Sequence, residues 1–370
     1  MYGPVHGAGA PLSQRKGMAQ VSGAVQQAPE VIGGPPGRPP RGVMRALRDV
    51  GALLIRQREA TVLVVDVLLI IYFGFISTTG RTSFFTHLNL ITLTQLAAPI
   101  IILALGEVML LICGEIDLSV GFIYQLSPFV MYFLITDYHV PGLLAILIAL
   151  LVGPVIGWFN GFLTVALGLP SFIATLGTGF VINGIVLTWS GAQQQSVPPE
   201  VQGIGQWIGQ FAWAEIIWAV ILTAIFHVLL TRTRWGLYTV AAGGNQLGAR
   251  EAGVKVARIK YGNFMLSGLL GSFVGLQIAF QISIIDPTSG GYQPMFYAVA
   301  AAVIGGTAML GGSGTIIGAF LGGILLAVLT NGFSVIGISA NPLPIIFGSA
   351  ILLAMIANVQ LTRLRDRGRA

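Results

Sequence analysis

The sequence contains little charge, and this scarcity excludes most classes of soluble protein. Asp, Glu, Lys and Arg make up 9% of the 370 residues, against about 25% in an average globular domain. The apolar fraction is 55% and the mean hydropathy is +0.84, so the chain has too few charged residues to cover a water-exposed surface. These values exclude a soluble enzyme, a nucleic-acid-binding protein and a secreted disulfide scaffold, and they predict an all-α polytopic membrane protein.

Cysteine and histidine are scarce as well. The single Cys113 cannot form a disulfide within the chain, so the sequence places no redox constraint on the compartment. The four histidines show neither metal-ligand spacing nor a zinc-protease pattern: His6, His87, His139 and His227. We predict that this chain binds no metal and no cofactor and holds no catalytic residue.

Basic residues are present, but only in a few places. The 19 Lys and Arg fall at 15–58, 81, 232–260 and 363–369, and they are absent from 82–231 and 261–362. Clusters of this kind hold the loops and ends of a membrane protein in the cytoplasm. The net charge of +6 therefore indicates topology and not a nucleic-acid partner.

The first 42 residues have the composition of a disordered segment. Nine Gly and seven Pro stand in residues 1–42 without a sustained apolar period, so little burial would offset the entropy cost of ordering. We predict a disordered cytoplasmic tail at 1–42, a basic interfacial segment at 43–59 and a basic cytoplasmic C-terminus at 363–370.

Long apolar runs fill residues 60–362, the predicted transmembrane domain. A helix that spans a bilayer needs about 20 mainly apolar residues, and on this rule the chain has about ten spans. Six precede the basic loop at 231–262 and four follow it, so the loop and both chain ends are predicted in the cytoplasm. The segments 119–136 and 296–310 are the weakest, and each is a candidate for a broken or re-entrant helix. The spans are 60–78, 89–112, 119–136, 143–167, 171–189, 212–230, 263–284, 296–310, 316–336 and 343–360.

Two motifs recur at nearly one offset, which predicts an internal repeat. Ile116–Gly121 (IDLSVG) is echoed by Ile285–Gly290 (IDPTSG), and the Asn-Gly-Phe at 160–162 is echoed at 331–333. The offset covers five spans, an odd number, so the two copies would be inverted in the membrane. Inverted repeats are a common transporter architecture, with the substrate path at their interface.

The segment after the second predicted span carries two acids. A charged side chain near the bilayer centre costs about 2.5–3.5 kcal/mol on insertion scales, and no Lys or Arg of the same region neutralises Glu115 or Asp117. One interpretation is a broken helix, with Asp117 and Ser119 facing a polar cavity. The other is that Asp117 caps the helix that starts near Leu118. The two interpretations are compatible.

A further acid, Glu107, lies in the preceding apolar run. It either lines the path or is protonated and hydrogen-bonded to a neighbouring helix. Together with the repeated Asn160, the candidate path residues are Glu107, Glu115, Asp117, Ser119 and Asn160.

The basic loop contains a short helix signal. Gly-Gly-Asn breaks the chain, Gln246 to Ala252 can form two helical turns, and Gly253 supplies a C-terminal stop. A short helix on the cytoplasmic face suits docking into a groove of a partner, whereas the loop's basic residues, such as Arg232 and Lys255, serve to anchor it. The candidate docking residues are Gly243, Gly244, Asn245, Arg250, Glu251 and Gly253.

A glycine-rich run at 305–318 invites comparison with a phosphate-binding loop. No Lys follows it and no strand precedes it, so we do not expect it to bind a nucleotide. Close helix packing through small residues explains the run.

These motifs resemble the permease subunits of the ribose, xylose and galactose group of bacterial ABC sugar importers. The resemblance runs from Phe84 to the C-terminus and rests on Ile116–Gly121, Pro170–Gly177, Gly243–Val254, Gly305–Gly318 and Asn331–Phe333. It implies a homo- or heterodimer of permeases, ATPase subunits that bind ATP and Mg, and an extracytoplasmic sugar-binding protein. It also implies that the loop at Gly243 to Gly253 contacts the ATPase.

The chain departs from that group at three places near the expected path. Glu115 stands where the group usually has Gly, the stretch Phe122–Gln125 is bulkier, and Tyr292–Phe296 replaces a stretch that often carries acids. These departures leave the sugar open.

The expected function is thus the permease of an ABC importer for a monosaccharide or related polyol in the inner membrane. The alternative is an ion-coupled secondary transporter that uses Glu107, Glu115 or Asp117. A third class, an intramembrane enzyme, is not supported, because the sequence shows no nucleophile–base pair and no set of metal ligands.

Overall fold

The computed structural model describes residues 58–77 and 83–337, together with 344–346, 348, 349, 352 and 356. The predicted tail at 1–42, nearly all of the segment 43–59, most of the span 343–360 and the C-terminus 363–370 lie outside the described residues. In the described part the only sheet pairs two short antiparallel strands, β1 (Gln195–Ser196) and β2 (Ile284–Ile285).

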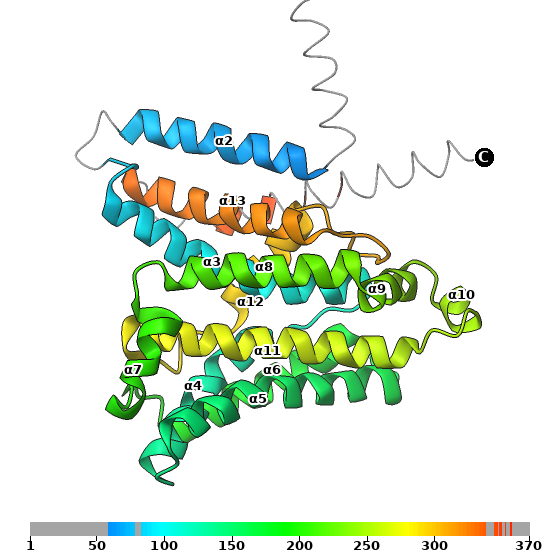
Figure 1. The fold of residues 1–370 in the computed structure, drawn as a ribbon, viewed down its shortest axis with the longest axis horizontal. Helices are drawn as coiled ribbons and strands as arrows, with labels where there is room; N and C mark the ends of the chain where they lie inside the picture. Colours follow the sequence, from blue (N-terminus) through cyan, green and yellow to red (C-terminus); the bar gives the residue numbers. More distant parts are fainter. Residues whose placement is uncertain are drawn as a thin grey trace, which may run out of the picture. The chain divides into compact units, whose positions relative to one another are not determined.

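All other regular elements in the described residues are helical (Figure 1). They are α2 (Arg58–Ser77), α3 (His87–Ile112), α4 (Val120–Thr136), α5 (Gly142–Gly161) with the π-helical turn η1 (Phe162–Ala166), α6 (Ser171–Ser190), η2 (Pro199–Val201), α7 (Gln202–Gly205), η3 (Gln206–Gln210), α8 (Ala214–Arg232), α9 (Arg234–Gly244), α10 (Gln246–Glu251), α11 (Val256–Ile282), α12 (Tyr292–Ile304) and α13 (Ile316–Val335).

Seven helices of the described part are long and apolar enough to cross a membrane: α2, α3, α5 with η1, α6, α8, α11 and α13. This confirms the prediction of an all-α polytopic membrane protein. The two weakest predicted spans correspond to the short apolar helices α4, of 17 residues, and α12, of 13 residues. At 1.5 Å per residue they measure about 25 and 20 Å, less than the roughly 30 Å of a hydrocarbon core.

Two predicted boundaries are wrong. Helix α11 begins at Val256 and not at 263, so the basic loop at 231–262 is more helical than its composition indicates. Helix α12 covers Tyr292–Ile304, whereas the predicted span was 296–310. In both cases the helix extends into a stretch whose polar or glycine residues lower the local hydropathy.

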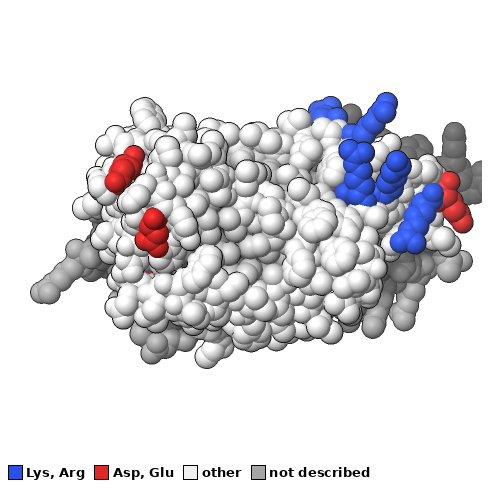
Figure 2. Space-filling view, turned by 90° about the horizontal axis from the view of Figure 1, so that it is seen from below, with Lys and Arg blue, Asp and Glu red and all other residues white. Residues whose placement is uncertain are grey.

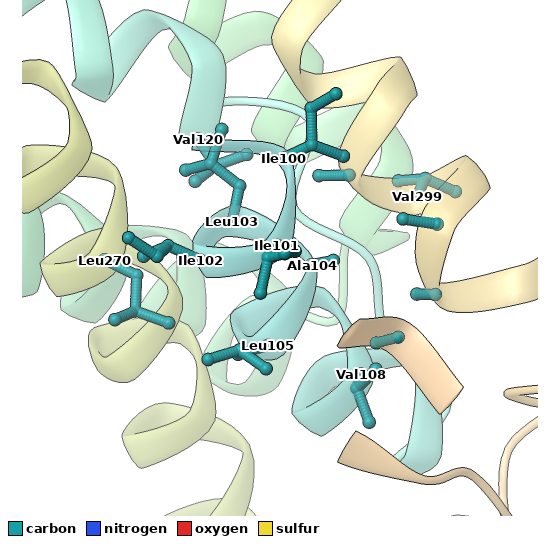
Figure 3. Packing of buried hydrophobic residues seen from close by; sticks show 14 of the residues in the cluster. Ile100, Ile101, Ile102, Leu103, Ala104, Leu105, Val108, Val120, Leu270 and Val299 are labelled. Atoms are coloured by element: carbon teal, nitrogen blue, oxygen red, sulfur yellow. The ribbon is translucent and has the colours of Figure 1, made fainter. Parts of the chain in front are cut away.

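Helix α3 forms the core of the bundle. From Ala97 to Ile112 its residues are apolar on every face apart from Glu107, which is the pattern of a buried helix, and all of these residues except Pro99 are buried. Figure 3 shows Ile100 to Leu105 of α3 packed beside Leu270 of α11 and Val299 of α12.

Small residues bring α5 and α11 into close contact. Gly153, Gly157 and Gly161 recur every four residues on α5 and face α11. A Cβ atom at Gly153 would overlap the carbonyl oxygen of Gly268, and one at Gly157 would overlap that of Phe264. Close approach of helix backbones through such small residues is the usual packing mode in membranes.

The predicted inverted repeat is present in the helices. Helices α3, α4 and α5 correspond to α11, α12 and α13, and Ile112, which ends α3, stands 170 positions before Ile282, which ends α11. In Figure 1, α3 and α5 run toward the end of the bundle that carries α9 and α10, whereas α11 and α13 run away from it. The helices α3 and α5 therefore run in the opposite direction to their counterparts α11 and α13.

Charge is distributed unequally along the bundle. Figure 2 shows Lys and Arg gathered at one end, which we call the basic end, with an acidic side chain beside them, and further acidic side chains but no Lys or Arg at the opposite end of this face. The basic end carries α9, α10 and the start of α11. Between the ends, α2, α5, α6 and α8 expose apolar side chains such as Leu68, Leu151, Phe180 and Val220, as helices in contact with lipid do.

Candidate functional site

A turn at the end of α3 separates it from the short α4. Gly114 has a positive φ of 78°, a conformation that glycine adopts at little cost, and residues 113–119 form the α3–α4 loop. Within this loop the Oδ1 atom of Asp117 accepts hydrogen bonds from the backbone N–H of Ser119 at 2.8 Å and from its hydroxyl at 2.6 Å. The Nδ2 of Asn160 in α5 donates to the Ser119 hydroxyl oxygen at 2.8 Å.

Three of the five candidate path residues therefore form one cluster. Asp117, Ser119 and Asn160 are fully buried, although Asn160 lies more than 40 positions further along the chain. The residues that the sequence repeat singled out are thus neighbours in space.

The capping interpretation of Asp117 needs a correction in position. Helix α4 begins at Val120 with Ser119 as its N-cap residue, two residues later than the predicted start near Leu118. Asp117 bonds the N–H of Ser119 itself, so it fixes the turn that precedes the helix rather than a free N–H of the first helical turn.

The α3–α4 loop is held against α6 by two hydroxyl groups. The backbone N–H of Ile116 donates to Ser171 Oγ at 3.3 Å, and that of Leu118 donates to Thr175 Oγ1 at 3.0 Å. Both hydroxyls belong to the first turns of α6, within the Pro170–Gly177 motif. These bonds satisfy one partly buried and one buried donor that the loop leaves without a helical partner.

Glu115 is not part of the Asp117 cluster. Its carboxylate forms an ion pair with Lys260 in the second turn of α11. The expectation that no cation is close enough to neutralise these acids is therefore wrong for Glu115, because the fold brings in a lysine 145 positions away.

Glu107 lies within α3 and is fully buried. Neither of its carboxyl oxygens has a hydrogen-bond partner among the described residues, and the same is true of Asp117 Oδ2. Within the described residues, Glu107 therefore makes no hydrogen bond to a neighbouring helix.

The echo of Asp117 has the same local geometry. Asp286 Oδ1 accepts from the backbone N–H of Thr288 at 2.7 Å and from its hydroxyl at 2.8 Å, and Asp286 Oδ2 accepts from Gln194 Nε2 at 2.8 Å. Unlike Asp117, Asp286 is partly exposed. Partial burial alone would raise the pKa of Asp286, but the bonds from Thr288 and Gln194 outweigh it and lower this pKa below its ordinary value.

A cavity of about 350 Å³ lies between α3, α4, α11, α12 and α13. This volume falls within the range of small-molecule sites, about 300–1,000 Å³. None of the five candidate path residues lines it. Amide and hydroxyl side chains stand among its apolar lining residues: Thr92, Gln95, Tyr124, Gln281, Gln293, Tyr297 and Thr330.

Two of these residues, Tyr124 and Gln293, lie in the stretches that the sequence placed near the expected path, Phe122–Gln125 and Tyr292–Phe296, but the other five were not predicted. The available signal was an isolated glutamine inside an apolar run, as at Gln95 and Gln281, but a single amide does not show which face of a helix it occupies. Gln293 and Tyr297 are joined by a hydrogen bond of 3.0 Å from the amide to the phenol oxygen, which the spacing of four residues in α12 permits.

At the basic end, α9 and α10 form most of the predicted cytoplasmic loop at 231–262, and we call these two helices the coupling loop. Asn245 ends α9 and caps α10, with its Oδ1 accepting from the N–H of Gly248 at 2.9 Å. Gly253 has a φ of 83° and closes the turn after α10. The chain break occurs at Asn245, since Gly243 and Gly244 form the last turn of α9.

Gly243 fixes the loop to the bundle. A Cβ atom there would overlap the carbonyl oxygen of Ile112, the last residue of α3, and the same oxygen accepts from the N–H of Gly312 at 2.7 Å. The loop, the end of α3 and the glycine-rich run therefore meet at one point.

Helix α10 turns one side outward. Ala249 is 6% exposed and faces the bundle, whereas Leu247 is 68% exposed, and Arg250 and Glu251 are exposed as well. In Figure 1 α10 stands beyond the ends of the membrane helices. An exposed leucine between polar residues on a projecting helix is suited to a groove in another protein.

The buried α3, the inverted repeat and the apolar outer surface define a multi-pass membrane permease. The chain belongs to the family described as "Branched-chain amino acid transport system / permease component", which it matches over residues 89–358. Members of this family are transport subunits and not themselves enzymes.

Relatives cover most of the chain. The chain is 34% identical over 319 residues to the xylose/arabinose import permease protein of Sulfolobus acidocaldarius. This alignment covers 84% of this chain and 87% of the relative. The chain is 33% identical over 316 residues to the autoinducer 2 import system permease protein of Escherichia coli, over 84% of this chain and 89% of the relative. A probable ABC transporter permease protein of Sinorhizobium fredii is 32% identical over 280 residues, covering 72% and 80% of the two chains. No solved structure matches the chain.

Proposed function

We propose that this chain is the permease subunit of an ATP-binding-cassette importer that moves a monosaccharide or related polyol across the cytoplasmic membrane. The observation that carries the proposal is the match to import permeases along most of the chain, joined to a projecting α10 of the kind that docks on a partner. The relatives are subunits of import systems, which favours an ATP-driven permease over the ion-coupled secondary transporter that the sequence left open.

The basic end supports an orientation. By the positive-inside rule, α9, α10 and the start of α11 face the cytoplasm, as do both chain ends by the parity of the predicted spans. The opposite end, with β1, β2 and Asp286, then faces the extracytoplasmic side of the inner membrane.

An importer of this kind needs partner subunits for ATP hydrolysis and for substrate binding. ATP and Mg bind to separate ATPase subunits that dock at α10, so this chain needs no cofactor of its own. An extracytoplasmic sugar-binding protein delivers the substrate to the opposite end, and a second permease, identical or homologous, completes the membrane part. Lipid covers the apolar outer faces.

The substrate class rests on the relatives and on the lining of the path. Xylose and arabinose, two small sugars rich in hydroxyl groups, appear in the name of one relative, and autoinducer 2 appears in the name of another. The neutral amides and hydroxyls of the cavity and the Asp117 cluster offer hydrogen bonds of the kind that such molecules exchange with water. The five candidate path residues remain part of this proposal.

The test is reconstitution. The chain, purified with the ATPase and binding protein encoded beside it, is placed in liposomes, and uptake of radiolabelled xylose, arabinose, ribose and galactose is measured. Uptake that requires ATP and the binding protein, and that persists when ionophores remove proton and sodium gradients, supports the proposal. Uptake driven by an ion gradient without ATPase would overturn it.

A further inference from the structure

One ion pair in the described part of the chain links the basic end of α11 to the α3–α4 loop. Lys260 lies in the second turn of α11, just after the coupling loop, and its ammonium group contacts the carboxylate of Glu115. The two side chains are only 13% and 10% exposed. At such partial burial, an attraction between opposite charges is screened less than on an open surface.

One turn further along α11, Asn263 ties the same region together. Its Oδ1 accepts from Trp235 Nε1 of α9 at 2.8 Å, and its Nδ2 donates to the carbonyl oxygen of Met109 in α3 at 3.1 Å and to Thr239 Oγ1 of α9 at 3.3 Å. Asn263 is fully buried. The start of α11, α9 and the end of α3 are therefore joined by buried hydrogen bonds, which hold their relative positions strongly.

The α3–α4 loop leads from this junction into the bundle. Two residues after Glu115 stands Asp117, whose cluster reaches α5 through Asn160. The loop backbone is bonded to Ser171 and Thr175 of α6. A displacement of Glu115 is thus passed on to α4, α5 and α6 through contacts that are all at hydrogen-bonding distance.

We propose that Glu115 and Lys260 are positioning residues that carry movement of the α9–α10 coupling loop to the α3–α4 loop, and so couple ATP hydrolysis to opening of the path. The inference rests on the proposed function. Lys260 reaches the loop from the element that follows α10, and the pair joins that element to the first residues after α3. Asn263 keeps α9 and α11 moving together, so a pull on α10 by the ATPase reaches Lys260.

The alternative is that the ion pair only stabilises the fold, like a staple between α11 and the α3–α4 loop. The two roles predict different effects on stability, ATP hydrolysis and uptake. A staple, when removed, lowers the amount or the melting temperature of the folded protein and reduces ATPase and uptake together. A coupling pair, when removed, leaves ATP hydrolysis running while uptake falls. The ratio of ATP hydrolysed to sugar imported therefore separates them.

The experiment uses the complete complex in liposomes with its binding protein and the best transported sugar. Glu115→Gln and Lys260→Met each remove one charge, the double variant Glu115→Lys with Lys260→Glu reverses the pair, and Arg258→Met removes an exposed charge from the same helix as a control. Because mutations along a coupling route change the coupling energy by about 0.5–2 kcal/mol, we expect the single variants to raise the ratio of ATP to sugar about 2- to 30-fold. The reversed pair should return toward the wild-type ratio, and Arg258→Met should not change it.

A ratio that stays at the wild-type value in both single variants overturns the inference, as does a proportional loss of ATPase and uptake with a lowered melting temperature. Failure of the reversed pair to recover overturns the assignment to the pair. If the charge-removing variants do not fold, Glu115→Asp replaces them, because it keeps the charge but shortens the side chain. An unchanged ratio of ATP to sugar in Glu115→Asp would also overturn the inference. Wild-type complex without sugar-stimulated ATPase would instead contradict the proposed function.

Discussion

The backbone N–H of Gly291 donates to the carbonyl oxygen of Gly121 at 2.9 Å. This bond joins the starts of α12 and α4, the two short helices of the inverted repeat. Gly290, the repeat equivalent of Gly121, is in the same contact, because a Cβ atom at Gly290 would closely approach the Gly121 carbonyl oxygen. Equivalent residues of the two copies thus meet each other, as expected at the axis that relates inverted repeats.

This close contact predicts that adding a single methyl group at Gly121 strongly lowers the stability of the folded protein. In Gly121→Ala the Cβ atom would overlap the carbonyl oxygen of Gly291, which is backbone and cannot rotate away. We expect a loss of at least about 1–3 kcal/mol, the usual cost of overpacking, seen as a lower melting temperature of the purified protein.

The matched control is Gly184→Ala in α6, where a Cβ atom meets nothing within 4 Å. Replacing a glycine inside a helix by alanine stabilises by about 0.5–1 kcal/mol, so this variant should melt at the same or a higher temperature. Equal melting of both variants would contradict the close contact at Gly121.

Substitutions of Asp117 separate its charge from its hydrogen bonds. The side-chain oxygen of asparagine can still accept from the N–H and hydroxyl of Ser119, so Asp117→Asn should fold and transport at a reduced rate or with altered sugar preference. Asp117→Leu leaves both donors buried without an acceptor, at about 1–3 kcal/mol for such a group, and should be poorly folded or inactive. Uptake kinetics at matched membrane levels measure both, and wild-type rates of the Asn variant for every sugar would restrict Asp117 to a structural role.

The sequence predicted the class of fold because burial in a membrane leaves a strong compositional signal. The apolar second half of α3, interrupted only by Glu107, and the lack of Lys and Arg across 82–231 each follow from the cost of polar groups in lipid. The repeat was visible because both motifs, IDLSVG and IDPTSG, form the same local turn. In each, the Asp side chain accepts a hydrogen bond from the backbone N–H of the residue two positions later.

The pairing of residues far apart in the chain left no such signal. Lys260 reads as an anchor of the basic loop, and only the antiparallel packing of α3 and α11 brings it to Glu115. The same holds for Asn263, whose partners come from α3 and α9, and for Gln95, whose cavity is formed by five helices. A short motif reports its own local geometry, whereas these contacts depend on helix directions and crossing points.

The coupling loop predicts a defect in energy coupling without unfolding. Arg250 is exposed in the last turn of α10, where a positive charge suits the helix dipole by about 0.3–1 kcal/mol. Arg250→Glu should fold but lose sugar-stimulated ATPase and uptake, because it reverses the charge of the docking surface. Gly253→Pro should do the same, since it removes the N–H that bonds the carbonyl oxygen of Arg250 and cannot adopt a φ of 83°.

The control is Lys255→Glu, which reverses an exposed charge outside α10. It should keep most of the stimulated ATPase activity. Wild-type ATPase and uptake in Arg250→Glu and Gly253→Pro would rule out docking through α10.

The lowered pKa of Asp286 predicts that the stability of the folded protein decreases at acidic pH. Because the ionised form is favoured in the folded state, its stabilisation is fully present above the unfolded pKa of about 3.9 and is lost as pH falls through the lower folded pKa. Wild-type protein should therefore lose more melting temperature between pH 6 and pH 3 than Asp286→Asn does. Thermal melting of the two proteins in the same detergent compares them, and equal losses would show that these hydrogen bonds do not favour the charged form.

The single thiol of the chain gives a native probe of the junction between α3, α9 and α11. Cys113 is 2% exposed, its thiol donates to the carbonyl oxygen of Leu110 at 3.2 Å, and Asn263 packs against its sulfur at 3.5 Å. We expect N-ethylmaleimide to modify Cys113 slowly in the resting complex and faster in Asn263→Ala. That variant leaves Trp235 Nε1 without its acceptor, at a cost of about 1–3 kcal/mol, and so opens the junction more often.

Asn331→Ala is the matched control, since Asn331 is also a buried asparagine but bonds Asn89 by amide-to-amide hydrogen bonds of 2.9 Å. Its loss should destabilise the protein without exposing Cys113, and the mass of the labelled chain reports the modification directly because no other cysteine competes. If the coupling inference is correct, ATP turnover with sugar should also speed labelling of the wild type, since movement of the coupling loop must pass through this junction. Labelling that is equally fast in Asn263→Ala and Asn331→Ala, or unchanged in both, would show that the junction does not open as a unit.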